Sequence, residues 1–348
     1  MRRFRPHIIL LVILFLYKLL PQSFIERYYS DWLYLKIHEG LYWVYGYLPF
    51  PGFYLVIAVA FLYILKWMAI LVSDRSIPEK LIHITGHMAK WVVWYFILWG
   101  FNYGRVPLEK KLELDIRPLS KTEIIREIDT VAKELVLLRF QMEKDTAPIP
   151  EKYFQYQTTA SDQLAYTLHQ WKYRSVRVKG RELKEDLLLR FDVGGQYMPY
   201  TGEANIDAGV HYYSKPFYMV HEMCHANGFC GEATCNFMSY AVATNFNDKG
   251  FQYSVGINYL KYLLGDLYAA DSLTCLSMKD KFPTPLRYDL ELMRKHALQH
   301  TFRTSVIGEA INNVYLHLMG IPEGTSSYNK MVLLVYAWRH EQHHSSKY

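Results

Sequence analysis

Residues 53–72 (FYLVIAVAFLYILKWMAILV) are apolar almost without interruption, and this run constrains the fold more than any other feature of the chain. An α-helix needs about 20 such residues to cross the hydrocarbon core of a bilayer. The single charge, Lys66, lies close enough to one end for its amine to reach the headgroups. We therefore expect a membrane-spanning helix at residues 53–73.

Two further apolar segments, at residues 8–24 and 88–103, flank this run. The first follows a tail with three arginines and resembles a signal peptide, but no small-residue cleavage site follows it, so we expect an uncleaved anchor. The second is bracketed by aromatic residues, as is common near a bilayer interface. Each could instead be a buried or interfacial helix. We expect residues 1–104 to form a membrane anchor with about three transmembrane helices.

The distribution of Lys and Arg predicts an orientation. The N-terminal tail carries three arginines and the loop at 73–90 carries three basic residues, whereas the loop at 21–52 carries two basic and three acidic residues. The positive-inside rule then places the N-terminus and the second loop in the cytoplasm. We expect a multi-pass protein of the bacterial cell membrane, with the chain beyond residue 104 on the extracytoplasmic side.

Residues 105–348 have the pattern of a globular domain that is mainly α-helical with a small β element. A capping box at Ser120 and Glu123, followed by apolar residues at steps of three and four, predicts one long helix. Short β-like pieces occur at residues 175–178 and 187–191. A net charge of +6 is mild for 348 residues and no long basic stripe occurs, so nucleic acid is not an expected partner.

Chemistry is concentrated at His221-Glu222-Met-Cys-His225, an HExxH motif. Helical residues four apart share a face, so His221 and His225 can both bind one Zn²⁺. Glu222, one position further on, can act as general base on the metal-activated water. The alternative is a core helix with two ordinary histidines.

A catalytic zinc site needs a third protein ligand, and Glu232 is the best candidate. Asn236 lies one helical turn later and could support a ligand through a hydrogen bond. The metzincin pattern places its third histidine where this chain has Gly231, which has no side chain to bind a metal. The rival third ligands are Cys230, Glu203, Asp207 or a distant residue.

Several segments together resemble an uncharacterised bacterial family of membrane-anchored HExxH proteins, a domain of unknown function with the features of zincin-type metallopeptidases. The resemblance covers most of the chain and is carried by residues Trp99–Arg105, Tyr197–Asn205, His221–Phe237, Phe251–Ser254, Asn313–Leu316 and Gly324–Tyr328. It implies a zincin-like fold and a metal site, and it names no substrate. The family usually has Glu-x-Glu-Ala-Asn where this chain has Glu232-Ala-Thr-Cys-Asn236, so Thr234 replaces the second Glu.

Three other features carry no expected catalytic role. His340–His344 repeats the HExxH spacing at the C-terminus, where nothing downstream can supply a third ligand. His83 and His87 share the four-residue spacing without a Glu, and we expect a solvated pair in the cytoplasmic loop. The four cysteines could form a disulfide or be small buried residues, and the sequence leaves their pairing open.

Peptide hydrolysis also needs a substrate-binding strand and a donor for the oxyanion. Residues 197–207, just before the HExxH motif, could supply an exposed strand edge or could be an ordinary surface loop. Candidate oxyanion donors are Tyr253, Tyr328 and His211.

We therefore expect a membrane-anchored zinc metallopeptidase that acts on a peptide or protein substrate. About three transmembrane helices would precede a zincin-like domain that holds Zn²⁺ through His221, His225 and Glu232. The alternatives are a catalytically inactive zincin-like module for membrane-tethered binding or assembly, and a membrane protein whose zinc is structural.

Overall fold

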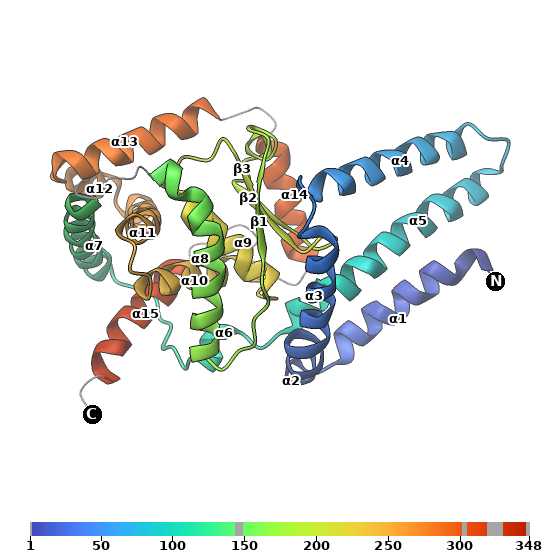
Figure 1. The fold of residues 1–348 in the computed structure, drawn as a ribbon, viewed down its shortest axis with the longest axis horizontal. Helices are drawn as coiled ribbons and strands as arrows, with labels where there is room; N and C mark the ends of the chain where they lie inside the picture. Colours follow the sequence, from blue (N-terminus) through green and yellow to red (C-terminus); the bar gives the residue numbers. More distant parts are fainter. Residues whose placement is uncertain (1, 143–148, 301–304, 319–329, 346–348) are drawn as a thin grey trace.

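The computed structural model describes residues 2–142, 149–300, 305–318 and 330–345. An arm of three long helices projects from a larger helical body, and the N-terminus lies at the tip of the arm (Figure 1). The described part of the chain contains one three-stranded sheet. The prediction of a mainly helical chain with a small β element is confirmed.

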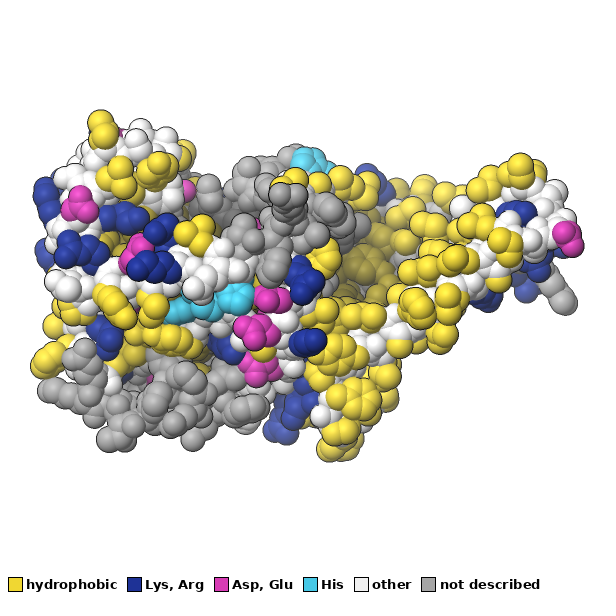
Figure 2. Space-filling view, turned by 90° about the horizontal axis from the view of Figure 1, so that it is seen from above, with side chains coloured by type: hydrophobic (Ala, Val, Ile, Leu, Met, Phe, Trp, Pro, Cys, Tyr) yellow, Lys and Arg dark blue, Asp and Glu magenta, His cyan; other side chains and the backbone are white. Residues whose placement is uncertain are grey.

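The arm consists of α1 (Arg5–Leu19), α4 (Phe53–Leu71) and α5 (Ile77–Leu98). Between α1 and α4 the chain forms α2 (Gln22–Phe24), a π-helical segment η2 (Ile25–Leu33) and α3 (Tyr34–Tyr45) at the base of the arm. Apolar side chains make up most of the face of the arm that Figure 2 shows, with charged side chains near its tip.

By length and composition, the helix α4 can cross a membrane, with a mean hydropathy of 2.2 over its apolar window. A second candidate is the pair formed by α1 and residues Gln22–Tyr45, which bends by 108°. The described residues thus contain one or two candidate membrane-spanning helices near the N-terminus.

The segment predicted as a third span at 88–103 differs in its bounds. The helix α5 begins earlier, at Ile77, and ends at Leu98, and a 3₁₀ helix η3 (Gly100–Gly104) follows. Trp99 and Asn102 are buried in the body rather than exposed to a bilayer. The helix ends there because Trp99 packs into the main hydrophobic core, which also contains Ile25 and Tyr34.

The body has the following elements in chain order: α6 (Leu108–Lys111), α7 (Lys121–Met142), α8 (Ile149–Gln170), β1 (Lys179–Leu183), η4 (Leu189–Phe191), β2 (Gly195–Met198), β3 (Glu203–Asp207), α9 (Lys215–Ala226), α10 (Glu232–Thr244), α11 (Lys249–Ala270), α12 (Ser272–Asp280), α13 (Thr284–Gln299), α14 (Ser305–Leu318) and α15 (Lys330–Ser345). The predicted capping box is present at the start of α7, where the Ser120 backbone N–H donates to Glu123.

The strands lie elsewhere than the β-like pieces predicted at 175–178 and 187–191. The backbone N–H groups of Val176 and Val178 donate to side chains of Asn227 and Ser161 instead of to a neighbouring strand. Residues 189–191 form the 3₁₀ turn η4. The prediction is therefore wrong, because both pieces lie in extended or turn segments outside the ladder.

The sheet has the order β1-β3-β2, in which β1 runs parallel and β2 antiparallel to β3. One face packs against α9. On the other face Phe53, at the start of α4, packs with Leu183 and Met198. The sheet therefore connects the helix that carries the HExxH motif to the base of the arm.

Candidate metal centre

The helix α9 begins and ends at residues that suit its termini. Pro216 occupies the first turn, where a missing N–H costs no hydrogen bond. Gly228 has φ +82°, a left-handed conformation that ends the helix and that a residue with a Cβ adopts only with strain. The chain then turns and α10 starts at Glu232, so the two helices pack against each other.

Three donor atoms from these helices converge. His221 Nε2 lies 3.0 Å from Glu232 Oε2 and 3.1 Å from His225 Nε2, and His225 Nε2 lies 3.5 Å from Glu232 Oε2. Ligand atoms about 2.1 Å from a tetrahedral zinc are separated by roughly 3.4 Å from each other. The spacing of the three donors is therefore compatible with one metal ion of this size, and the group found among the described residues has three members.

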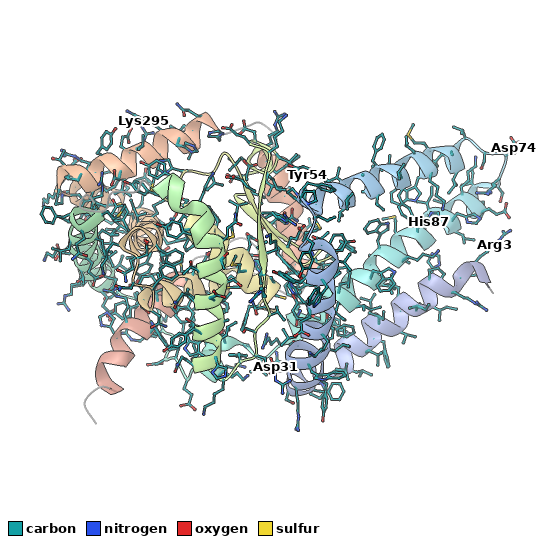
Figure 3. The ribbon with its side chains drawn as sticks, in the orientation of Figure 1. Arg3, Asp31, Tyr54, Asp74, His87 and Lys295 are labelled. Carbon is teal, nitrogen blue, oxygen red and sulfur yellow. The ribbon has the colours of Figure 1, made fainter. Side chains whose placement is uncertain are left out.

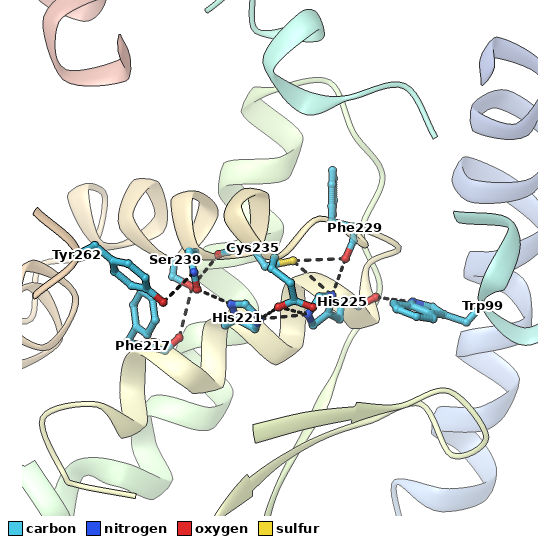
Figure 4. A network of polar contacts seen from close by, with 10 residues as sticks. Trp99, Phe217, His221, His225, Phe229, Cys235, Ser239 and Tyr262 are labelled. Atoms are coloured by element: carbon cyan, nitrogen blue, oxygen red, sulfur yellow. Dashed lines mark hydrogen bonds and ion pairs between the residues drawn. The ribbon is translucent and has the colours of Figure 1, made fainter. Parts of the chain in front are cut away.

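The other ring nitrogens of both histidines are held by acceptors (Figure 4). His221 Nδ1 is 2.7 Å from Asn236 Oδ1, and His225 Nδ1 is 2.7 Å from the Phe229 carbonyl oxygen. A carbonyl only accepts, so Nδ1 of His225 carries the proton, and the Asn236 oxygen favours the same tautomer of His221. Both Nε2 lone pairs are thereby directed toward the position between the rings, as in metal-binding histidines.

The carboxylates of Glu232 and Glu222 give the site around the two histidines a charge that favours a cation. Burial would lower the pKa of His225, but the carboxylates of Glu232 and Glu222 outweigh burial and raise that pKa to about 9. Burial would raise the pKa of Glu232, but the two imidazoles hold it well below its ordinary value. The group thus attracts positive charge, whether a proton or a metal ion.

Glu222 lies beside these donors and against strand β2. Its side chain is buried, and burial raises the pKa of its carboxyl, while the Tyr197 backbone N–H donates to it and opposes that rise. A Cβ on Gly195 would lie 2.9 Å from Glu222 Oε1, so only glycine leaves room for the carboxylate at this point. A carboxyl with a raised pKa, close to but outside the ligand group, suits proton transfer.

Side chains from the first 105 residues hold the end of α9. Trp99 Nε1 donates to the His225 carbonyl at 3.2 Å, Tyr34 Oη to the Ala226 carbonyl at 2.9 Å, and Arg105 Nη1 to the Asn227 carbonyl at 3.2 Å. The last carbonyls of a helix have no partner within the helix. Three successive carbonyls at the end of α9 are therefore satisfied by residues that the sequence suggested were part of, or next to, the anchor.

Arg105 is itself buried and paired with acids of the π-helical segment. Its Nη2 lies 2.6 Å from Asp31 Oδ1 and its Nε lies 3.6 Å from Glu26 Oε1. The guanidinium also lies over the Phe229 ring, 4.3 Å from its centroid. No sequence motif pointed to Arg105, Trp99 or Tyr34 in this role, because the contacts join segments more than 100 residues apart.

The rival third ligands have other partners. Asp207 accepts hydrogen bonds from the backbone N–H groups of residues 186, 188, 189 and 209. Glu203 accepts from Gly52 N and Arg181 Nε. Burial raises the pKa of the Cys230 thiol well above its ordinary value. These three residues are outside the converging group, as is Thr234.

Two of the oxyanion candidates, Tyr253 and His211, do not lie at the converging group. Tyr253 is fully buried and donates to Asp289 Oδ2 at 2.6 Å, with its ring against Tyr213. His211 lies in a separate cleft beside His296. Tyr328 lies outside the described residues. Two unpredicted tyrosines are closer to the group, since Tyr262 accepts a hydrogen bond from Asn236 and Tyr218 lies near Glu222.

The converging group found among the described residues includes no member of the C-terminal HExxH repeat, of the His83 and His87 pair or of the cysteines. His340, the first residue of the C-terminal repeat, lies 3.2 Å from Glu127. The expectation that His83 and His87 form a solvated pair in a loop is wrong, because both are half-buried within α5. Trp67 Nε1 donates to His87 Nδ1 at 3.2 Å. All four cysteines are free and buried.

Comparison with known proteins gives one result. No curated protein and no solved structure matches the chain. A family model described as "Protein of unknown function (DUF3810)" matches residues 29–336, which include the metal-binding candidates on α9 and α10 and the segments that hold the end of α9. The chain belongs to this family.

Proposed function

We propose that the protein is a membrane-anchored zinc metallopeptidase with a zincin-like active site. The observation that carries the proposal is the convergence of His221, His225 and Glu232 beside a buried carboxylate, Glu222, that is not part of the converging group. A structural zinc site needs no such additional acid.

The chemistry follows from the positions of the side chains. Zinc held by the three donors would supply a water of lowered pKa and polarise the scissile carbonyl. Glu222 takes the proton of the attacking water and then gives it to the leaving amine, a transfer that its raised pKa favours. Asn236 and the Phe229 carbonyl keep the two imidazoles oriented throughout.

Strand β2 is suited to bind an extended peptide. It is at the edge of the sheet, and the Gly194 carbonyl at its start accepts from Asp207 N of β3. By the alternation of an antiparallel ladder, the polar backbone groups of Gly195 and Tyr197 point away from β3. A substrate strand can pair with the backbone groups of Gly195 and with the Tyr197 carbonyl, next to Glu222, which itself accepts from the Tyr197 N–H.

The finer membrane topology is also part of the proposal. We infer that α1, α4 and α5 each cross the bilayer, because large apolar side chains are exposed along all three. Exposed aromatic residues at the base of the arm, among them Tyr28, Trp32 and Trp43, are typical of the interface. Arginines at positions 2, 3 and 5 mark the opposite end as cytoplasmic, so the body lies on the extracytoplasmic side.

The metal content of the full-length protein, purified in detergent, tests the site. We expect about one zinc per chain. His221→Ala should abolish binding, whereas removal of the histidines at 340, 343 and 344 should leave the bound zinc unchanged. Absence of zinc, or zinc that does not depend on His221, would refute the proposal.

The variant Glu222→Gln separates an enzyme from an inactive binding module and from a structural site. An enzyme should retain its zinc and lose peptidase activity by about 10²- to 10⁴-fold, the usual contribution of a general base. A wild-type protein that binds zinc but cleaves no peptide in a broad library, with Glu222→Gln indistinguishable from it, would favour the binding module.

A further inference from the structure

A cavity of about 440 Å³ lies between α4 and α5 in the half of the arm toward its tip, far from the metal centre. Four of its lining residues are basic or imidazole side chains: Lys66, Arg75, His83 and His87. Ser73, Ala69 and Ile70 complete the lining, so no acidic side chain faces the cavity. Figure 3 shows His87 within the arm, and Arg3 and Asp74 at its tip.

The proton on His87 is fixed by its neighbour. The Trp67 indole can only donate, and it donates to Nδ1 of His87 at 3.2 Å. Neutral His87 therefore carries its proton on Nε2, where it is a hydrogen-bond donor and not a metal ligand. The lining thus offers two cationic side chains and a fixed imidazole donor, a set that suits an anion.

Nearby charged groups at the tip are already engaged. Arg3 pairs with Glu79 at 2.6 Å, and Lys80 donates to the Leu71 carbonyl at 2.8 Å, at the end of α4. Asp74 precedes Arg75 in the chain but does not line the cavity. Clustered like charges between membrane helices are costly unless a counter-charge is bound, and such residues commonly mark a functional site.

We propose that this cavity binds the phosphate headgroup of an anionic phospholipid from the leaflet at the tip of the arm. Lys66 and Arg75 neutralise the phosphate, and His87 Nε2 donates a hydrogen bond to one of its oxygens. The acyl chains lie along the exposed apolar side chains of α4, such as Leu65 and Met68. Basic pockets between membrane helices on the cytoplasmic side bind anionic lipids in this way. The proposal rests on the proposed membrane topology and does not depend on the peptidase activity.

Native mass spectrometry of the full-length chain in detergent, titrated with phosphatidylglycerol, phosphatidylcholine or inorganic phosphate, tests this site. We expect phosphatidylglycerol to bind about tenfold more tightly than phosphatidylcholine, and inorganic phosphate to compete weakly. The double variant Lys66→Gln/Arg75→Gln should weaken phosphatidylglycerol binding roughly 25-fold, at about fivefold for each charge removed.

Arg5→Gln is the matched control, because it removes one arginine near the same tip without touching the lining. It should change binding by less than about twofold. Equal binding by the double variant and the wild type, or equal affinity for the two lipids, would overturn the proposal. So would inorganic phosphate that displaces phosphatidylglycerol at equal concentration, since the ligand would then be a soluble phosphate. An unchanged gel-filtration profile and zinc content verify that each variant is folded.

Discussion

Two histidine pairs in this protein share one spacing and have opposite surroundings. His221 and His225 on α9 each have Nδ1 held by an acceptor, and the carboxylate of Glu232 lies within 3.5 Å of both rings. In the pair His83 and His87 on α5, Nδ1 of His87 accepts a hydrogen bond from the Trp67 indole. The charged residues that line the same cavity are Lys66 and Arg75.

The difference shows that the four-residue spacing places two imidazoles on one helix face but does not decide what they bind. The partner of Nδ1 decides which nitrogen carries the proton, and the neighbouring charges decide the sign of the ligand. One pair is therefore suited to a cation and the other to an anion.

The largest expected effect is the loss of zinc from a variant that still binds lipid, and the reverse variant should keep its zinc. His221→Ala should abolish zinc binding and leave phosphatidylglycerol binding intact, because the cavity between α4 and α5 is remote from α9. His87→Ala should leave about one zinc per chain and weaken lipid binding. Metal analysis and native mass spectrometry on the same preparations give both readouts. Loss of zinc in His87→Ala would contradict the separation of the two sites.

A smaller effect is expected when the Nδ1 acceptor at the metal centre is removed. Asn236→Ala should raise the zinc dissociation constant about 10- to 100-fold, the usual cost of losing such a support. Asn236→Asp retains an acceptor for His221 and should retain tight binding. Competition with a chromophoric chelator measures both variants, and an unaltered dissociation constant in Asn236→Ala would show that the imidazole needs no such support.

A fifth histidine, His38, extends the comparison to a ring with neither kind of ligand. It is fully buried beside Tyr34 and Tyr197, and burial lowers its pKa to about 4 despite the nearby Glu39. The unfolded chain, with a histidine pKa of about 6.5, therefore binds the proton first, and folding stability declines as the pH falls from about 6.5 toward 4.

Between pH 7 and pH 5 we expect His38 to contribute a loss of about 2 kcal/mol. Thermal unfolding in detergent at both pH values should show a smaller decrease for His38→Gln than for the wild type. Some decrease should persist, because burial also lowers the pKa of His211 to about 4. Identical pH dependence in the variant and the wild type would rule out His38 as a contributor.

The smallest expected effect concerns the donor to His87. Trp67→Phe keeps an aromatic ring and removes the indole N–H, so either nitrogen of His87 can carry the proton. We expect phosphatidylglycerol binding to weaken only about fivefold, because Lys66 and Arg75 remain. The same lipid titration measures it, and a loss as large as that of the double variant would mean that the imidazole, not the charges, dominates the site.

The convergence of His221, His225 and Glu232 could be expected from the sequence, because local geometry determines it. The HExxH spacing places His221 and His225 on one face of α9, and the turn at Gly228 brings Glu232 and Asn236 opposite them. These relations extend over only 16 residues. Helical periodicity and one glycine were sufficient to expect them.

The sheet and the base of the arm could not be predicted in the same way. Strand β3 is polar in sequence (Glu-Ala-Asn-Ile-Asp) yet fully buried, because Arg181 and backbone N–H groups satisfy Glu203 and Asp207. Contacts between distant segments decide all of these features.

The hydrogen bonds from Tyr34, Trp99 and Arg105 to the end of α9 make the body depend on the N-terminal part of the chain. A fragment cut after residue 105 would leave α9 with three carbonyls that have lost their partners, so the body is not an independent unit that could be shed in working form. The last carbonyls of α9 gain their partners only when these N-terminal segments pack against the body. Under the proposed function, a fragment that begins after residue 105 should therefore lack peptidase activity even though it keeps His221, His225, Glu232 and Glu222.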